Sequence, residues 1–128
     1  MKNLDGQSAH IENRLPCGSS NPYLVMAGVL AAGLDGLKNK TEPPTETEGI
    51  AYGLTGVTDL PTRLGQSLDA LEDDATLRAA LGEEFIKLFV AVKRHEIGKA
   101  KGAIPDYDSP EFNNTVNEWE RNEYFEFL

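Results

Sequence analysis

The order of apolar and polar positions predicts helices over most of this chain. Residues 22–34 place apolar or small side chains on every face of a helix, a pattern typical of a helix surrounded by protein. Asn21 followed by Pro22 predicts where this helix begins, because Asn accepts from the first free N–H groups and Pro has no N–H to leave unpaired. We therefore expect a buried helix over residues 21–40.

Glycines interrupt this helix at Gly28, Gly33 and Gly36. Each lowers helix propensity by about 1 kcal/mol relative to alanine, so a compensating contact is expected. Close approach of a neighbouring segment to Gly28 or Gly33 is the compensation that we predict. On this reasoning the helix is the most buried element of the chain.

Residues 41–66 predict a loop, because prolines, glycines and an acidic patch break any regular period. Helices follow over residues 67–128. Ser67 is the expected cap of the first, and a second should run from Asp74 to Leu81 and end on Gly82. Each of these boundaries rests on a local capping signal.

The clearest amphipathic pattern runs from Glu83 to about Lys101. Its apolar side chains fall on one side of the predicted helix: Phe85, Ile86, Phe89, Val90 and Ile97. A last helix is expected to start at Thr115, whose spacing to Glu118 predicts a capping box. That helix would carry an apolar stripe made of Val116, Trp119, Tyr124, Phe127 and Leu128.

Residues 1–18 predict a strand and loop. Their one apolar stretch, Ile11–Leu15, reads as a strand or extended piece stopped by Pro16. A lone strand has unpaired backbone groups on both edges, so its partners are expected in polypeptide outside this chain. The predicted fold class is mainly α with a short N-terminal β element.

Composition narrows the possible partners. The 128 residues include 21 acidic and 12 basic side chains, a net charge of −9, which disfavours nucleic acid and anionic membrane. The longest uncharged apolar stretch, Pro22–Leu34, is shorter than the ~20 residues that span a bilayer. The single Cys17 and the polar start of the chain predict a cytoplasmic protein.

Glu12 and Arg14 are the strongest candidate site. Side chains two residues apart in a strand point to the same side, so a carboxylate would lie beside a guanidinium. A carboxylate can bind a metal ion and a guanidinium can bind an anion. For an arbitrary sequence, a surface salt bridge is the more common meaning of this spacing.

Other reactive residue types carry weaker signals. His10 and His95 are expected to be exposed, and Cys17 is expected to be an unreactive thiol. Trp119 could stack on a nucleotide, but its helical spacing to other aromatic residues favours a core or interface stripe.

Several motifs resemble the C-terminal part of the catalytic domain of the glutamine synthetase family. ENR with LP at 12–16, NPYL at 21–24 and GLDG with KNK at 33–40 follow one another at family spacing. EPP with AY, ALG, KR and WER are further matches along the chain. The resemblance implies a fragment of an α+β catalytic domain that forms a γ-glutamyl amide from glutamate and ammonia or an amine. It implies ATP and Mg²⁺ or Mn²⁺ as cofactors, with γ-glutamyl phosphate as the intermediate.

By the same resemblance, Glu12 is a metal ligand and Arg14 binds anionic oxygens of glutamate or of the phosphoryl group. His10 departs from an arginine found in many relatives, which leaves contacts to the adenine side open. The resemblance further implies a homo-oligomer. The remaining ligands would lie in the upstream part of the domain, so the chain alone should be inactive.

Two alternatives within the family stay open. The acceptor can be ammonia or a larger amine, as in γ-glutamyl-polyamine ligases. The other alternative is a non-catalytic structural protein of the lengsin type, against which the retention of Glu12 and Arg14 argues. The upstream sequence would distinguish them, because an enzyme needs the other metal ligands.

Overall fold

The computed structural model describes residues 10–45, 47–49 and 54–125. The described residues form helices and no strand, so the mainly helical prediction is confirmed and the N-terminal β element is not formed there. The elements are α1 (Pro22–Asn39), α2 (Leu64–Asp73), α3 (Ala75–Leu81), α4 (Glu83–Ala103), the short 3-10 helix η1 (Glu111–Asn114) and α5 (Glu118–Tyr124).

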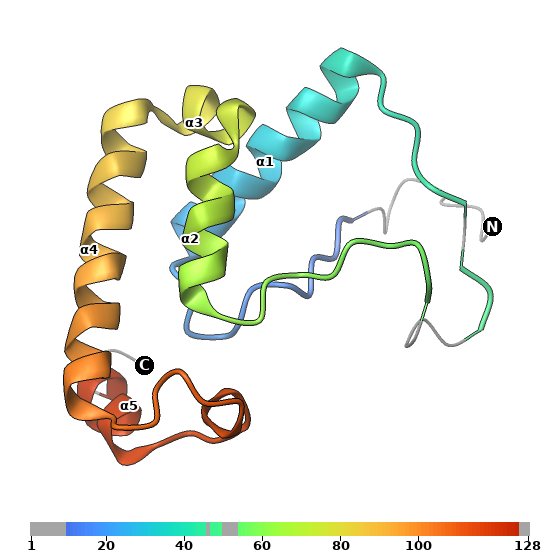
Figure 1. Ribbon diagram of the computed structural model, residues 1–128. Helices are drawn as coiled ribbons and strands as arrows, with labels where there is room; N and C mark the ends of the chain where they lie inside the picture. Colours follow the sequence, from blue (N-terminus) through green and yellow to red (C-terminus); the bar gives the residue numbers. More distant parts are fainter. Residues whose placement is uncertain (1–9, 46, 50–53, 126–128) are drawn as a thin grey trace.

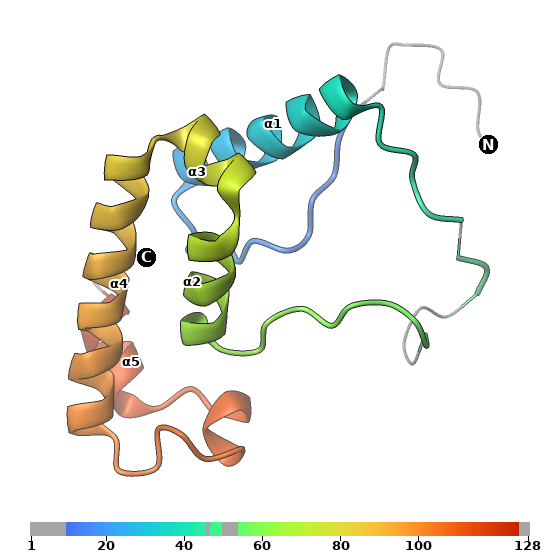
Figure 2. The ribbon, with the colours of Figure 1, turned by 45° about the horizontal axis from the view of Figure 1, so that its top comes forward.

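Two views show how the helices are arranged. Helices α2 and α4 lie side by side, joined at one end by α3, and α1 extends away from α3 (Figure 1). The chain after α4 turns back through η1 to α5, which lies near the other end of α4 (Figure 2). The described residues of the connection before α2, 41–45, 47–49 and 54–63, lie mostly apart from these helices in both views.

Helix α1 begins where the sequence predicts. The Asn21 side chain accepts hydrogen bonds from the backbone N–H groups of Tyr23, at 3.0 Å, and Leu24, at 3.3 Å. At the other end, Lys40 adopts the left-handed conformation with φ 53°, and its N–H donates to the carbonyl of Leu37. Local capping alone therefore accounts for both ends of this helix.

The predicted burial of α1 is wrong for this chain. None of its residues is buried, and a Cβ added at Gly28, Gly33 or Gly36 would meet nothing within 4 Å outside the helix itself. The physical reason is that, among the described helices, α1 packs mainly against the short helix α3. The glycines therefore have no packing partner that would offset their cost within this structure.

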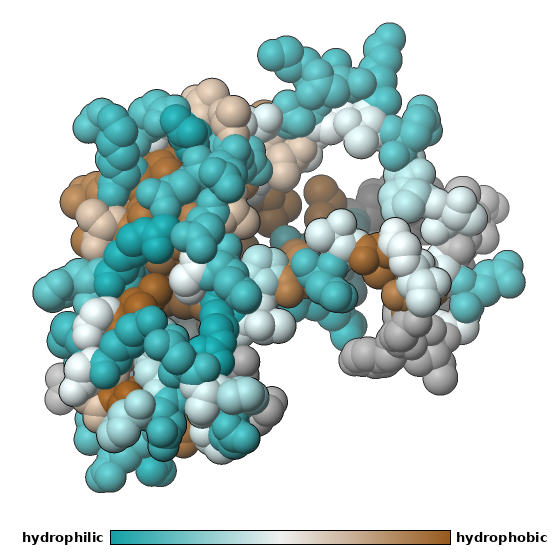
Figure 3. All heavy atoms as spheres, viewed as in Figure 1, coloured by the Kyte–Doolittle hydropathy of each residue, from teal (hydrophilic) through white to brown (hydrophobic). Residues whose placement is uncertain are grey.

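The core lies instead between α2 and α4. Leu68, Ile86 and Val90 are between 2% and 4% exposed. Partly buried side chains surround them: Leu71, Leu81, Phe89 and Ile97. Figure 3 shows apolar residues along this seam and hydrophilic residues over much of the same face. The amphipathic pattern of α4 is thus confirmed, although Phe85 at its edge is 39% exposed.

Exposed ion pairs join α4 to the helices beside it. The Arg94 guanidinium on α4 contacts both Asp69, at 2.7 Å, and Glu72 of α2. These carboxylates raise the pKa of Arg94, mainly through the hydrogen bond to Asp69. Lys99 on α4 similarly pairs with Glu123 on α5. Such exposed pairs orient the helices but contribute little to stability.

Two helix starts differ from the sequence prediction. Helix α2 starts at Leu64, and Ser67 lies inside it, where its hydroxyl donates to the carbonyl of Arg63 at 3.3 Å. Helix α5 is capped by Asn117 rather than Thr115, with a complete capping box between Asn117 and Glu120. Of the predicted terminal stripe, Phe127 and Leu128 lie outside the described residues.

Among the described helices, none has the length and apolar character needed to cross a bilayer.

Candidate functional site

Glu12 and Arg14 lie together in an irregular segment just before α1. Arg14 Nε is 2.5 Å from Glu12 Oε1, so the two side chains share one side of the chain without a strand. The side chains are 57% and 86% exposed, respectively. Between them, the Asn13 side chain accepts from the backbone N–H of Leu15 at 3.0 Å, which fixes a local turn. The predicted pair is therefore in contact and open to solvent.

The chemistry of the Glu12 side chain suits a divalent cation, but one carboxylate does not make a metal site. Its carboxylate offers hard oxygen atoms, which suit Mg²⁺ or Mn²⁺. Within the part of the chain that the structure describes, no group of three or more histidine, cysteine or acidic side chains could hold a metal ion. The described residues therefore do not form a cluster of such side chains around Glu12.

The turn between this pair and α1 contains Cys17. Its sulfur lies 3.0 Å from the Ser19 hydroxyl oxygen and 3.5 Å from that of Ser20. These hydrogen bonds, the one to Ser19 most strongly, lower the pKa of Cys17 from 9.0 to about 7. The thiol is also exposed, so the expectation of an unreactive thiol does not fit the structure.

We expect the alkylation rate of Cys17 to rise with pH and to reach half its maximum near pH 7, because the thiolate reacts and its pKa is about 7. The measurement is the initial rate of iodoacetamide labelling between pH 5 and pH 10. Replacing both Ser19 and Ser20 by alanine should move the midpoint toward pH 9, where the thiol normally titrates. Unchanged midpoints in that variant would contradict the hydroxyl contacts.

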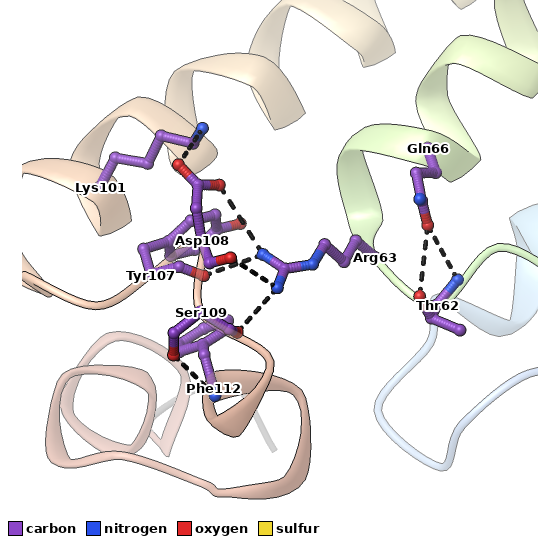
Figure 4. Close-up of polar contacts among 8 residues, drawn as sticks. All are labelled: Thr62, Arg63, Gln66, Lys101, Tyr107, Asp108, Ser109 and Phe112. Carbon is purple, nitrogen blue, oxygen red and sulfur yellow. Dashed lines mark hydrogen bonds and ion pairs between the residues drawn. The ribbon is translucent and has the colours of Figure 1, made fainter.

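A polar cluster around Arg63 joins the start of α2 to the loop after α4 (Figure 4). The Arg63 guanidinium donates to the carbonyl oxygens of Tyr107, Asp108 and Ser109, at 3.0, 3.0 and 2.7 Å. Lys101 holds the Asp108 carboxylate at 2.9 Å from the other side. This arrangement fixes the loop against α2.

Sequence reasoning missed Arg63 because a basic residue at a helix start opposes the helix dipole. Tertiary hydrogen bonds to three carbonyl groups offset that cost here. A local signal was present in the sequence. The Gln66 side chain accepts from the backbone N–H of Thr62 at 3.1 Å. This contact resembles half of a capping box, but the two residues are four positions apart instead of three.

A cavity of about 480 Å³ lies between the start of α2, the end of α4 and α5. Both carboxylates that line it already accept hydrogen bonds. Glu96 accepts from Lys93 at 2.9 Å and from the Tyr124 hydroxyl at 3.1 Å, and Glu120 accepts from the Asn117 N–H. Burial, and then the charge of Glu96, raise the pKa of Tyr124 to about 12. These groups serve packing between α4 and α5.

The other residues considered from the sequence are Trp119 and the two histidines. Trp119 packs edge-on against Tyr124, with ring centroids 6.1 Å apart, as expected for an aromatic stripe. His95 and His10 are both exposed, as predicted.

Comparison with known proteins identifies the family. Residues 2–124 match the sequence profile described as glutamine synthetase, catalytic domain, and the chain belongs to this family as part of the C-terminal region of that domain. The chain is 39% identical over 127 residues to a glutamine synthetase of Thermococcus kodakarensis. It is 40% identical over 125 residues to a gamma-glutamylanilide synthase of Acinetobacter, and 42% identical over 92 residues to human lengsin.

These matches cover very different shares of the two sequences. The first two include 94% of this chain but only 28% and 24% of those relatives. The lengsin match includes 71% of this chain and 18% of lengsin. The chain thus spans less than a third of the length of these relatives.

Proposed function

We propose that this chain supplies the C-terminal part of the catalytic domain of an ATP-dependent ligase that joins ammonia or a larger amine to the γ-carboxyl group of glutamate. The observation that carries the proposal is the family match over residues 2–124, which includes the contacting pair Glu12 and Arg14. Membership of a family whose relatives are named as synthetases supports an enzymatic parent.

The reaction needs two transfers. A γ-carboxylate oxygen of glutamate attacks the terminal phosphorus of ATP and releases ADP. The amine then attacks the acyl carbon, phosphate leaves, and the amine nitrogen loses a proton. Each step develops or moves negative charge on oxygen, so bound cations and guanidinium groups lower its barrier.

Glu12 is proposed to hold one of the divalent cations. Such a cation, when bound, would neutralise charge on the phosphoryl oxygens. The exposure of the Glu12 carboxylate supports this role, because it leaves room for ligands from elsewhere. The neighbouring Arg14 orients the carboxylate through the contact between Arg14 Nε and Glu12 Oε1.

Arg14 is proposed to bind anionic oxygens of the substrate. Its contact with Glu12 uses Nε, so the two terminal nitrogens of the guanidinium are available to bind an anion. A planar fork of this kind suits a carboxylate or phosphoryl group. The pair then positions a cation and an anion next to one another.

Both family alternatives bear on this proposal. The match to a gamma-glutamylanilide synthase supports an acceptor larger than ammonia, in line with the amine-ligase alternative. The match to lengsin keeps a non-catalytic role as the second candidate. A cytoplasmic location and a homo-oligomeric parent remain predictions.

The test is a chimera in which this chain replaces the matching segment of the Thermococcus kodakarensis enzyme. We expect ATP hydrolysis that requires both glutamate and an amine, measured as phosphate release with ammonia, putrescine or aniline as acceptor. The control is this chain alone, which should give no such release. Comparing the rates with the three acceptors shows how far this part of the domain determines which amine is preferred.

A chimera with the melting temperature and oligomeric state of the parent enzyme, but without glutamate-dependent turnover, would refute the catalytic proposal. That result would favour the non-catalytic alternative. The complete open reading frame offers an independent check, because a ligase requires intact metal carboxylates upstream of this chain.

A further inference from the structure

Aromatic side chains gather around the cavity of about 480 Å³ between the start of α2, the end of α4 and α5. Four rings line it: Tyr107, Phe112, Trp119 and Tyr124. Cavities of this size, with apolar and aromatic walls and a few polar groups, are typical of small-molecule sites. The lining residues all lie between Thr62 and Tyr124, so a single stretch of this chain builds the cavity.

The four rings form two pairs. Trp119 and Tyr124 meet edge-on with their centroids 6.1 Å apart, and the centroids of Tyr107 and Phe112 are 4.6 Å apart. Lys101, which does not line the cavity, places its ammonium group 5.5 Å from the centroid of the Tyr107 ring. Aromatic rings attract ammonium groups because the face of the ring carries partial negative charge. The chain thus already holds one cation against these rings.

The charges of the cavity wall leave one carboxylate without a balancing cation. Arg63, Glu96 and Glu120 are the charged residues that line the cavity. The Arg63 guanidinium binds three carbonyl groups and lies 3.7 Å from the Asp108 carboxylate. Glu96 is paired with Lys93 at 2.9 Å. Among the residues that the structure describes, Glu120 has no such cationic partner.

The capping box of α5 holds Glu120 in place. Glu120 Oε2 accepts from the Asn117 N–H at 3.1 Å, and the Glu120 N–H donates to the Asn117 side chain at 2.9 Å. Within the described part of the chain, the second carboxylate oxygen, Oε1, has no hydrogen-bond partner. Glu120 is half-buried, so its charge is less solvated than that of a surface carboxylate. Such a carboxylate favours a cation and disfavours an anion.

We infer that this cavity binds an organic ammonium ion, with the charged group at Glu120 and the apolar body among the four rings. The carboxylate and the aromatic faces both favour a ligand that combines positive charge with apolar surface. Neither Glu12 nor Arg14 lines the cavity, so we assign binding there and no step of the ligase reaction. This site goes beyond the proposed function and does not depend on it.

The fluorescence of Trp119 tests the inference, because this residue lines the cavity and is the single tryptophan of the chain. The probe is phenethylammonium chloride, titrated into this chain at pH 7, where an alkylamine is protonated. Two compounds of similar shape are compared with it: neutral 2-phenylethanol and anionic 3-phenylpropionate. We expect a saturable change with phenethylammonium and at least about tenfold weaker binding of the other two compounds.

Glu120→Gln tests the carboxylate while keeping the cap, because glutamine also serves in a capping box. This variant should bind phenethylammonium at least about fivefold more weakly than the unsubstituted chain. Glu118→Gln is the matched control, since it removes the same charge from an exposed position of α5 that does not line the cavity. Its affinity should be unchanged. Helical circular dichroism checks that both variants fold.

Four results would overturn the inference. Equal affinity for 2-phenylethanol would mean that the cavity selects apolar surface alone. Tighter binding of 3-phenylpropionate would mean that it favours anions. Unchanged affinity in Glu120→Gln would remove the carboxylate from the site, and the absence of saturation with phenethylammonium would mean that the cavity binds no such ion.

The comparison of the three compounds on the unsubstituted chain decides the matter even where Glu120→Gln fails to fold. The same measurements separate this site from the proposed function. An inactive chimera contradicts only the function, whereas a chain that does not discriminate among the three compounds contradicts only the ammonium site.

Discussion

Replacing Glu12 by alanine in the chimera should reduce turnover by at least about 100-fold and leave folding almost unchanged. Loss of a metal carboxylate removes charge stabilisation at the phosphoryl group. Stability should barely respond, because an ion pair as exposed as Glu12 with Arg14 contributes about 0–1 kcal/mol. The measurements are phosphate release with saturating glutamate and amine, and thermal unfolding followed by circular dichroism.

Two control variants test whether the loss of turnover comes from the charge of Glu12 and from its position in the chain. Glu12→Gln keeps the size of the side chain and loses its charge, so it should be almost as inactive as Glu12→Ala. Glu84→Ala removes a carboxylate on α4 that is also exposed, at 90% against 57% for Glu12, and should retain full turnover. Wild-type activity in Glu12→Ala would show that this carboxylate is not a metal ligand.

Local signals in the sequence located several helix boundaries correctly. Asn21 and Pro22 start α1, and Gly82, with φ 98°, separates α3 from α4. In each case the deciding contact joins residues a few positions apart, or the backbone conformation strongly favours glycine. Such features can be predicted because they do not depend on the rest of the fold.

The starts of α2 and α5 were misplaced for different reasons. The start of α2 is held by contacts of Arg63 with a loop more than forty residues later, and the local signal from Gln66 to Thr62 was overlooked. Before α5, Thr115 and Asn117 each have a glutamate three residues on. After η1, the backbone N–H of Thr115 donates to the carbonyl of Phe112. Asn117, rather than Thr115, is the residue that caps α5.

The candidate site was predictable only as a pair. Spacing put Glu12 and Arg14 on one side, and the structure brings them into contact. The rest of a metal site could not be predicted from this chain, because its described residues offer no further ligand cluster. The burial of α1 failed for a related reason: an apolar pattern reveals the need for partners, but not whether the same chain supplies them.

Replacing Ile86 by alanine should destabilise the chain by about 2–5 kcal/mol, the second large effect that we expect. Ile86 is 3% exposed and packs with Leu68 and Val90 in the seam between α2 and α4. Truncation removes apolar contacts and leaves a cavity that two helices joined by short turns cannot readily close. Because small domains are stable by only about 5–15 kcal/mol, much of the folded population should be lost.

Urea unfolding of the chain, followed by helical circular dichroism, measures this effect. The matched control is Leu88→Ala on the same helix, where the side chain is 66% exposed and truncation should cost no more than about 0.5 kcal/mol. Equal losses at Ile86 and Leu88 would contradict a core confined to the α2–α4 seam. A larger loss at Leu88 in the chimera than in the chain alone would instead indicate that this side of α4 is also covered in the complete domain.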